Sequence, residues 1–340
     1  MTTPTLRDVG QLAGVSIKTV SRVVNGDPEV AEATAEKVRE AIGVLGYRPN
    51  PLARSLRTGR DEAVGLVVET ISDPFFAAVT EAVEEAAREA GLFLIIASAG
   101  ATVDEERAVV LGLLHRSVSG LIVVPCRLDY GHERLPIGPG GVPVVFIDRA
   151  PEGFSADTVV VDNEDSARRA TAHLVAHGHR RIAFVGTSLD RVPLRHRLDG
   201  YKRALRDAGI AYDAALVVSH SRGVDATGPI LAGVLTMAEP ATAVLSANAV
   251  AAVDVVRELH GTGRTDVAFV SFDDFPIADS LTPPVTVHRQ DPTLMGRTAT
   301  ELLLRRLRGE DGPARHVVLP TTFLERGSGE IGPPSSPDPC

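Results

Sequence analysis

The sequence predicts two architectures in one chain: a small all-α domain at the N-terminus, and then an α/β region of two doubly wound parallel-sheet lobes. Apolar residues recur at helical spacing over residues 6–45. From Ala63 onward, short apolar strands alternate with amphipathic helices. The chain of 340 residues is also longer than a single ordinary core accommodates, which favours several folded parts.

The all-α domain is expected within residues 1–48. Three helices are predicted, over residues 6–13, 16–25 and 31–45. One face of the first helix carries the apolar side chains of Leu6, Val9, Leu12 and Ala13. Gly14 supplies a tight turn before the second helix, Ser16 is suited to cap that helix, and Gly46 ends the third. Three short helices with a tight turn between the first two form the helix-turn-helix pattern.

The second of these helices has an apolar back and a polar front, as a helix in the major groove of DNA requires. Lys18 and Arg22, one turn apart, can donate to guanine, and Ile17 can press on a thymine methyl group. Phosphate oxygens are in reach of Ser16, Thr19 and Asn25, and Ser21 lies on the same front. The alternative is an exposed amphipathic helix that binds nothing.

The charge distribution favours contact with phosphates at one end of the chain. The net charge is −9, but residues 1–60 hold nine basic and six acidic residues, so this part carries +3 and the remainder −12. Arginines gather after the third helix, at Arg48, Arg54, Arg57 and Arg60. A basic patch beside an acidic body suits a nucleic-acid partner, although a solvated surface is the alternative.

Residues 49–61 are predicted to connect the two architectures, with one or two helical turns over Leu52–Arg57. The strands expected beyond are Val64–Val68, Phe93–Ala97, Leu121–Val124, Val144–Ile147, Thr158–Val161, Ile182–Gly186, Ala243–Ser246, Val267–Ser271 and Val285–Val287. The helices expected between them are Phe76–Ala90, Asp104–His115, Glu164–His177, Arg197–Ala208, Val250–His260 and Pro292–Leu307. Nine strands over residues 62–326 fit two lobes better than one sheet. Residues 327–340 are rich in Gly, Ser and Pro, and we expect them to be disordered.

Polar and aromatic side chains follow many of the predicted strands, where parallel α/β sheets bind their ligands. The set comprises Asp73, Phe75, Phe76, Asp148, Arg149, Arg197 (expected to open a helix), Asn248, Asp273, Arg289 and Gln290. Carboxylates, guanidinium groups and amides can bind pairs of hydroxyl groups, and aromatic rings can cover the apolar face of a sugar. Singly, each has another explanation: Phe75 and Phe76 suit a core, and Asp73 suits a helix cap.

Residues 5–58 resemble the DNA-binding headpiece of the LacI/GalR family of repressors. The matching strings are Thr5–Val9, Ala13–Ser16, Thr19–Asn25, Gly46–Asn50 and Ala53–Leu56. The resemblance implies that Ile17 and Lys18 select the operator, and that residues 51–57 form a hinge helix with Leu56 as a minor-groove wedge. The DNA-binding residues expected are Thr5, Leu6, Ser16, Ile17, Lys18, Thr19, Ser21, Arg22, Asn25, Ala53, Arg54, Leu56 and Arg57.

Residues 62–326 resemble the effector domain of the same family, which is similar to periplasmic sugar-binding proteins. The matching strings are Ser72–Phe76, Phe146–Arg149, Asp162–Asn163, His177–Gly186, Arg197–Tyr201 and Ser271–Asp274. The resemblance implies effector contacts by Arg197 and Asp273 first. It adds Asp73, Phe75, Asp148, Arg149, Asn248 and Gln290. Two positions depart from the family pattern, because Ala249 replaces an expected Asp and Ser271 an expected Gly.

The sequence therefore predicts a cytoplasmic, homodimeric repressor of transcription that binds a pseudo-palindromic operator and answers to a sugar. Alternatives are a regulator that answers to a nucleobase or to no ligand, and a sugar-binding module without a DNA role. An enzyme is not expected, because the sequence holds no phosphate-binding Gly-x4-Gly-Lys loop or nucleophile elbow. No cofactor or metal is expected, and His173, His177 and His179 are assigned to structure. Neither a signal core nor a transmembrane run occurs.

Overall fold

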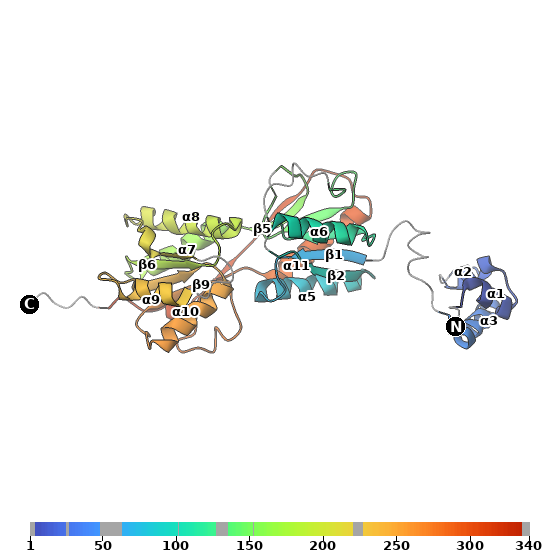
Figure 1. The fold of residues 1–340 in the computed structure, drawn as a ribbon, viewed down its shortest axis with the longest axis horizontal. Coiled ribbons are helices and arrows are strands. Elements are labelled where there is room, and N and C mark those ends of the chain that lie inside the picture. The colour runs from blue at the N-terminus through green and yellow to red at the C-terminus, as the bar shows by residue number, and fades with distance from the viewer. Residues whose placement is uncertain are drawn as a thin grey trace, which may run out of the picture. The chain divides into compact units, whose positions relative to one another are not determined.

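A computed structural model describes most of the chain, which divides into two compact units, Met1–Asp61 and Glu62–Cys340. Each unit is described by itself (Figure 1). The described residues are 4–24, 27–47, 63–100, 102–126, 135–151, 153–219 and 227–334. In this part of the chain, no helix is both long and apolar enough to cross a membrane.

The first unit contains the three predicted helices, α1 (Leu6–Ala13), α2 (Ile17–Val24) and α3 (Glu32–Leu45). Each helix contributes one fully buried valine to a shared core: Val9, Val20 and Val38. Gly14 has φ of +68° and so provides the left-handed turn that separates α1 from α2. Leu12, which was predicted to lie on the apolar face of the first helix, is an exception, because it is 52% exposed and lies outside the core.

The first lobe of the second unit is a six-stranded sheet in which all neighbouring strands are parallel. In spatial order the strands are β11 (His316–Leu319), β5 (Asp157–Val161), β4 (Val144–Ile147), β3 (Gly120–Val123), β1 (Ala63–Val68) and β2 (Phe93–Ser98). Two helices, α5 (Pro74–Glu89) and α11 (Pro292–Leu307), pack together on one face. The helix α6 (Val103–Leu114) contributes to the core on the other face.

The second lobe repeats this plan with one antiparallel edge strand, β12. The spatial order is β12 (Thr322–Leu324), β10 (Thr286–Arg289), β9 (Ala268–Phe272), β8 (Ala243–Ser246), β6 (Ile182–Gly186) and β7 (Val217–Ser219). Alternate residues of β6 point to opposite faces. Ile182 and Phe184 pack with α7 (Asn163–Ala176) and α8 (Val192–Asp207), and Ala183 and Val185 with α9 (Thr227–Thr236) and α10 (Ala249–Gly261).

The chain passes between the lobes three times: after β5, after β10 and after β11. As a result α11 and β11, which come late in the sequence, belong to the first lobe, and β12 returns to the second. The colours in Figure 1 show this return, since orange and red segments lie in both lobes. The predicted two-lobed, doubly wound fold is confirmed.

Several predicted elements differ from the structure. The strands β7, β11 and β12 and the helix α9 were not predicted, and α8 begins at Val192, so Arg197 lies inside that helix instead of opening it. Pro193 in the first turn supplies the start signal for α8, because proline fits where no backbone donor is needed. The start of α9 is obscured by Gly228 and Pro229, which are poor helix formers.

Disorder from Gly327 onward was also wrong for residues 327–334. Ser328 and Gly329 are buried. The hydroxyl of Ser328 donates to the carbonyl oxygen of Phe269 at 2.5 Å and accepts from the backbone nitrogen of Thr286 at 2.9 Å. Composition did not reveal these contacts, which fix the segment against β9 and β10. Residues 335–340 lie outside the described residues.

Candidate functional sites

A cavity of about 510 Å³ lies between the two lobes, and nine of the ten side chains that the strand ends predicted, all but Arg289, line it. They are Asp73, Phe75, Phe76, Asp148, Arg149, Arg197, Asn248, Asp273 and Gln290. Most of them directly follow a strand, so the cavity forms where the carboxyl ends of the two sheets meet. The structure therefore brings together residues spread over more than 200 positions.

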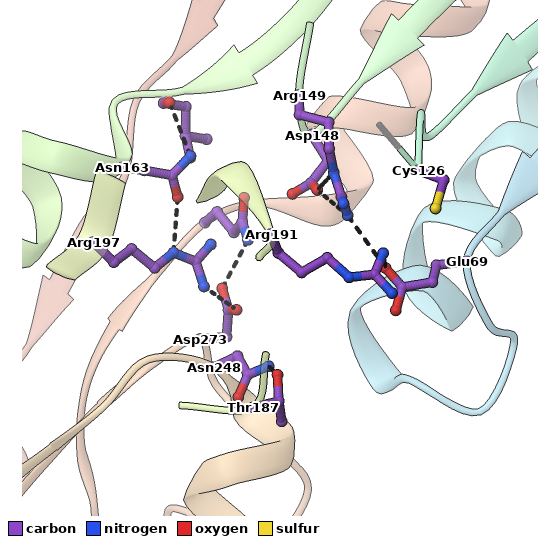
Figure 2. A network of polar contacts seen from close by, with 12 residues as sticks. Glu69, Cys126, Asp148, Arg149, Asn163, Thr187, Arg191, Arg197, Asn248 and Asp273 are labelled. Carbon is purple, nitrogen blue, oxygen red and sulfur yellow. Dashed lines mark hydrogen bonds and ion pairs between the residues drawn. The ribbon is translucent and has the colours of Figure 1, made fainter. Parts of the chain in front are cut away.

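Arg197 is at the centre of the second-lobe side of the cavity and is only 2% exposed. Its Nε donates to Asn163 Oδ1 at 2.8 Å (Figure 2), and its Nη1 donates to the carbonyl oxygen of Ala247 at 2.6 Å. Nη1 also lies 3.3 Å from Asp273 Oδ2, and the guanidinium group stacks on the ring of Phe272 at 3.5 Å. These contacts fix the guanidinium group in one orientation.

Two residues near the crossings between the lobes form hydrogen bonds with Arg197 and Asp273. Asn163, just after the first crossing, accepts from Arg197, and Gln290, at the second, donates from Nε2 to Asp273 Oδ1 at 2.9 Å. Gln290 Oε1 is buried without a hydrogen-bond partner among the described residues. The cavity is thus connected to two interlobe segments by hydrogen bonds.

The first-lobe side of the cavity holds a chain of alternating charges that reaches across to the second lobe. Arg149 Nε donates to Asp148 Oδ2 at 3.0 Å, and Arg149 Nη2 lies 3.5 Å from Glu69 Oε2. Glu69, directly after β1, pairs in turn with Arg191, which precedes α8 in the second lobe (Figure 2). An ion pair therefore joins the two lobes at the cavity.

Glu69 and Arg191 were missed by sequence reasoning, together with Asp190 and other residues of the loop after β6. The signal was available, because both positions follow strand ends, as the predicted residues do. With them included, the lining holds three arginines and five carboxylates, the latter being Glu69, Asp73, Asp148, Asp190 and Asp273. The cavity is therefore acidic when all of these groups are ionised.

Burial and neighbouring charge shift the titration of one lining carboxylate. The pKa of Asp73 is raised to about 6, first because of burial and then because of the nearby charges of Asp273, Asp148 and Glu69. Asp73 also caps α5, since its Oδ1 accepts from the backbone nitrogen of Phe75 at 3.0 Å. The capping explanation and the cavity role thus apply to the same residue.

The remaining lining residues also combine structural and surface roles. Phe76 is 5% exposed and belongs to the core of the first lobe, while the ring of Phe75 packs edge-on against it at 5.2 Å between centroids. Asn248 caps α10 by accepting from the backbone nitrogen of Ala251, and its Nδ2 donates to Thr187 Oγ1 at 3.1 Å.

The polar front predicted for the second headpiece helix is present on α2. Val20 is fully buried, while Ile17 is 45% exposed and Lys18 is exposed beside it. Ser16 caps α2 by accepting from the backbone nitrogen of Thr19 at 3.1 Å. Arg22 is in ion pairs with acidic residues of the following loop, which sequence reasoning did not anticipate.

Of the other expected DNA-binding residues, three lie in the described part of the chain and the rest lie outside it. Thr5 caps α1 through a reciprocal pair of hydrogen bonds with Asp8, and Leu6 packs against the headpiece core, so the described contacts of both are structural. Ser21 is half-buried on α2. The following lie outside the described residues: Asn25, Ala53, Arg54, Leu56, Arg57 and the rest of the expected hinge helix.

Comparison with known proteins identifies the family. Residues 5–50 match the family model "Bacterial regulatory proteins, lacI family", and residues 171–329 match "Periplasmic binding protein-like domain". The regulator CelR of Thermobifida fusca is 36% identical over 341 residues, which cover 96% of this chain and 98% of the relative. The chain belongs to the lacI family of bacterial regulatory proteins. It is therefore a DNA-binding transcription regulator.

Other lacI-family relatives and solved structures are similar over nearly their whole length. The repressor PurR of Vibrio atlanticus is 31% identical, covering 95% of this chain and 98% of the relative. The ribose operon repressor of Escherichia coli is 30% identical, covering 95% of this chain and 99% of the relative. Among structures, a CelR–cellobiose complex matches with a TM-score of 0.70 at 34% identity, covering 96% and 99%. The Lac repressor dimer bound to operator and the anti-inducer ONPF matches with a TM-score of 0.82 at 26% identity, also covering 96% and 99%.

One departure from the lacI-family pattern has a local structural role. Ser271 is fully buried, and its hydroxyl donates to the carbonyl oxygen of Asp273 at 2.8 Å. Asp273 has φ of +68°, a left-handed conformation that is unusual for a residue with a side chain. The Ser271 hydroxyl therefore helps to hold the turn that directs the Asp273 carboxylate into the cavity. Ala249 begins α10 and is buried, so it adds no polar group there.

Proposed function

We propose that this regulator is a homodimeric repressor whose operator binding is controlled by a neutral sugar bound between the lobes of the second unit. The observation that carries the proposal is the convergence of the nine expected residues on one cavity. Its volume of about 510 Å³ lies within the range of about 300–1,000 Å³ that is usual for small-molecule sites. Alternating carboxylates and guanidinium groups supply the acceptors and donors that bind neighbouring hydroxyl groups.

The charge of the cavity supports a neutral effector over an anionic one. Five carboxylates and three arginines line it, and the arginines Arg149, Arg191 and Arg197 are each paired with a carboxylate of the lining. A phosphate or carboxylate group on the ligand would meet a surplus of negative charge with low solvent screening. We therefore rank sugar phosphates below neutral sugars as candidate effectors.

A purine nucleobase is the second candidate effector. The ring of Phe75 lines the cavity, and a flat base can stack on an aromatic ring as well as a sugar face can. Among the similar structures, that of the Lac repressor contains ONPF and that of CelR contains cellobiose. The hydroxyl-binding pattern of the lining favours the sugar.

The DNA side of the proposal assigns base contacts to Ile17 and Lys18 on the exposed front of α2. A homodimer would present two such helices to the halves of a pseudo-palindromic operator. The hinge helix of residues 51–57 and the minor-groove wedge by Leu56 remain predictions. Support comes from the family match over residues 5–50 and from the Lac repressor dimer bound to operator.

Selection and calorimetry test this proposal. The full-length protein should select a two-fold symmetric sequence from a random duplex library. Titration with cellobiose, ribose, a sugar phosphate and hypoxanthine should give heat with a neutral sugar, and that sugar should change the affinity for the selected duplex. Binding of hypoxanthine alone would overturn the sugar assignment.

The variant R197K separates the two functions. Lysine keeps the positive charge but lacks the planar fork that Arg197 uses to bind Asn163, Ala247 and Asp273 together. We expect at least a tenfold loss of effector affinity, with affinity for the selected duplex unchanged in the absence of effector. Loss of duplex binding with intact effector binding would contradict the assignment of the cavity.

A further inference from the structure

Arg22, on the polar front of α2, is bound by two carboxylates from the loop that follows the helix. Its Nε lies 2.7 Å from Asp27 Oδ2, and its Nη2 lies 2.7 Å from Glu29 Oε2. The Arg22 side chain is 38% exposed, so the paired guanidinium group remains at the surface. The two Nη1 hydrogens and the second Nη2 hydrogen are the donors that these two ion pairs leave for another acceptor.

The loop backbone holds the two carboxylates in place. Asp27 Oδ1 accepts from the backbone nitrogen of Glu29 at 3.0 Å, and the backbone nitrogen of Asp27 donates to the carbonyl oxygen of Arg22 at 3.0 Å. The ion pair also lowers the pKa of Asp27 below its usual value, because Arg22 donates to its carboxylate. Asp27 is therefore ionised at neutral pH.

The effect of this pair of carboxylates on DNA binding depends on which DNA group approaches Arg22. A backbone phosphate carries a negative charge, so it is repelled by Asp27 and Glu29 and must compete with them for the guanidinium group. The O6 and N7 atoms of guanine are neutral acceptors and meet much less repulsion. Phosphate contacts supply the affinity that does not depend on sequence, whereas base contacts supply specificity.

We propose that Asp27 and Glu29 are positioning residues that restrain Arg22 from pairing with backbone phosphates and so raise the preference for operator over other DNA. The proposal rests on the DNA-binding role of α2 given above. It assigns specificity to two residues that need not touch the DNA themselves. Lys18, which lies exposed one turn earlier on α2, is not part of this arrangement.

The test compares two full-length variants that carry the same change in net charge. In D27N/E29Q the asparagine keeps an acceptor for the backbone nitrogen of Glu29 while both negative charges are removed. The control E32Q/E36Q removes two exposed charges from α3; Glu32 there pairs with Arg39 at 2.9 Å, away from Arg22. Affinity for the selected operator and for a scrambled duplex is measured over a series of salt concentrations, and circular dichroism confirms that helix content is unchanged.

We expect D27N/E29Q to bind the scrambled duplex about threefold or more tightly than the unaltered protein, with the operator affected less. The slope of log affinity against log salt for the scrambled duplex should steepen by about 1, which corresponds to one additional phosphate contact. The control should leave the ratio of operator to scrambled affinity unchanged. A ratio that changes equally in both variants, or in neither, would overturn the proposal.

A double-mutant cycle tests whether the carboxylates act through Arg22. In an R22Q background, D27N/E29Q should no longer lower the operator preference, because the group that they restrain is absent. If the preference falls as much in R22Q as in the unaltered background, the carboxylates repel phosphates directly and the positioning role is wrong. Failure of the unaltered protein to bind any duplex would instead overturn the proposed function, and this inference with it.

Discussion

At the scale of single residues, the two lobes share an unusual backbone conformation at the cavity. Asp148 follows β4 in the first lobe and Asp273 follows β9 in the second, and both have φ of +68°. Both are 7% exposed, and each lies beside an arginine of the lining. A residue with a side chain in this region costs about 1–3 kcal/mol and is found preferentially at functional sites. The paired strain supports assigning both carboxylates to ligand binding.

The raised pKa of Asp73 predicts a dependence of stability on pH. Its pKa in the folded protein is about 6 against 3.8 for the free side chain, so folding favours the protonated form. The stabilisation is complete below pH 3.8 and is lost as pH rises through 6, by up to about 3 kcal/mol. D73N keeps an acceptor for capping α5 but cannot ionise. Denaturant unfolding should show D73N gaining stability relative to the unaltered protein between pH 5 and pH 7.5.

The matched control for this prediction is D291N, which changes the exposed aspartate that caps α11 in the same way. Asp291 Oδ1 accepts from the backbone nitrogen of Leu294 at 2.9 Å. The free-energy difference between D291N and the unaltered protein should vary less over the same pH range than the difference for D73N. Equal variation for the two variants would show that burial in the cavity is not the cause.

Lys18 gives a prediction for sequence recognition. Its side chain is exposed on the front of α2, where it can donate to guanine in the major groove. K18A should weaken operator binding by about 1–3 kcal/mol per half-site and relax selectivity at one base pair of each half. Binding to a library with single substitutions in the operator measures both effects. A uniform loss over all sequences would assign Lys18 to phosphate contact instead.

At the residue scale, the chemistry of strand ends predicted the cavity well. Nine of the ten residues in the predicted set line the cavity; several, such as Asp148 and Asp273, directly follow a parallel strand, whereas Arg197 reaches the cavity from inside α8. The pairing of Arg22 with Asp27 and Glu29 was not predictable in the same way. It depends on how a loop folds back on the helix before it, and helical spacing gives no information about that.

At the scale of elements, the close approach of α7 and α8 depends on Gly200. A Cβ atom at this position would lie 2.1 Å from the backbone oxygen of Glu164, at the start of α7. G200A should therefore destabilise the second lobe by about 1–3 kcal/mol or more, as overpacking does. Gly233, in α9, has nothing within 4 Å of its Cβ position, so G233A should stabilise by about 0.5–1 kcal/mol. Denaturant unfolding should show a lower free energy of unfolding for G200A and a higher one for G233A than for the unaltered protein.

The strands that sequence analysis missed are all at sheet edges. β7, β11 and β12 each end a sheet, and β7 and β12 contain only three residues. Central strands such as β1, β3 and β4 are buried throughout and give continuous apolar runs that are easy to identify. The three missed strands hold only three or four residues each, so the apolar run that each contributes is too short to identify a strand, whereas the edge strand β2, with six residues, was predicted.

At the scale of the second unit as a whole, the ion pair between Glu69 and Arg191 joins the two lobes. Both side chains are nearly buried, at 12% and 13% exposure, so removal of one partner leaves a poorly solvated charge. R191A should lower the melting temperature by several degrees, at about 2–4 °C per kcal/mol for a domain of this size.

The control for this prediction is R203A, which breaks a pair with Glu164 inside the second lobe. These two side chains are about half-exposed, at 50% and 45%, and exposed ion pairs contribute little. Calorimetry should therefore give almost no change for R203A. A similar loss in both variants would mean that the interlobe pair does not stabilise the contact between lobes.

The three crossings between the lobes have a consequence for biosynthesis. Neither lobe is encoded by one continuous stretch, because α11 and β11 complete the first lobe and β12 the second, all within the last part of the chain. While a ribosome is still translating residues 292–324, the sheet face that α11 will cover is open to solvent, including the buried strands β3 and β4. Neither core can therefore close until almost the entire chain has been synthesised. Premature termination near residue 290 would release two incomplete lobes that are prone to aggregate.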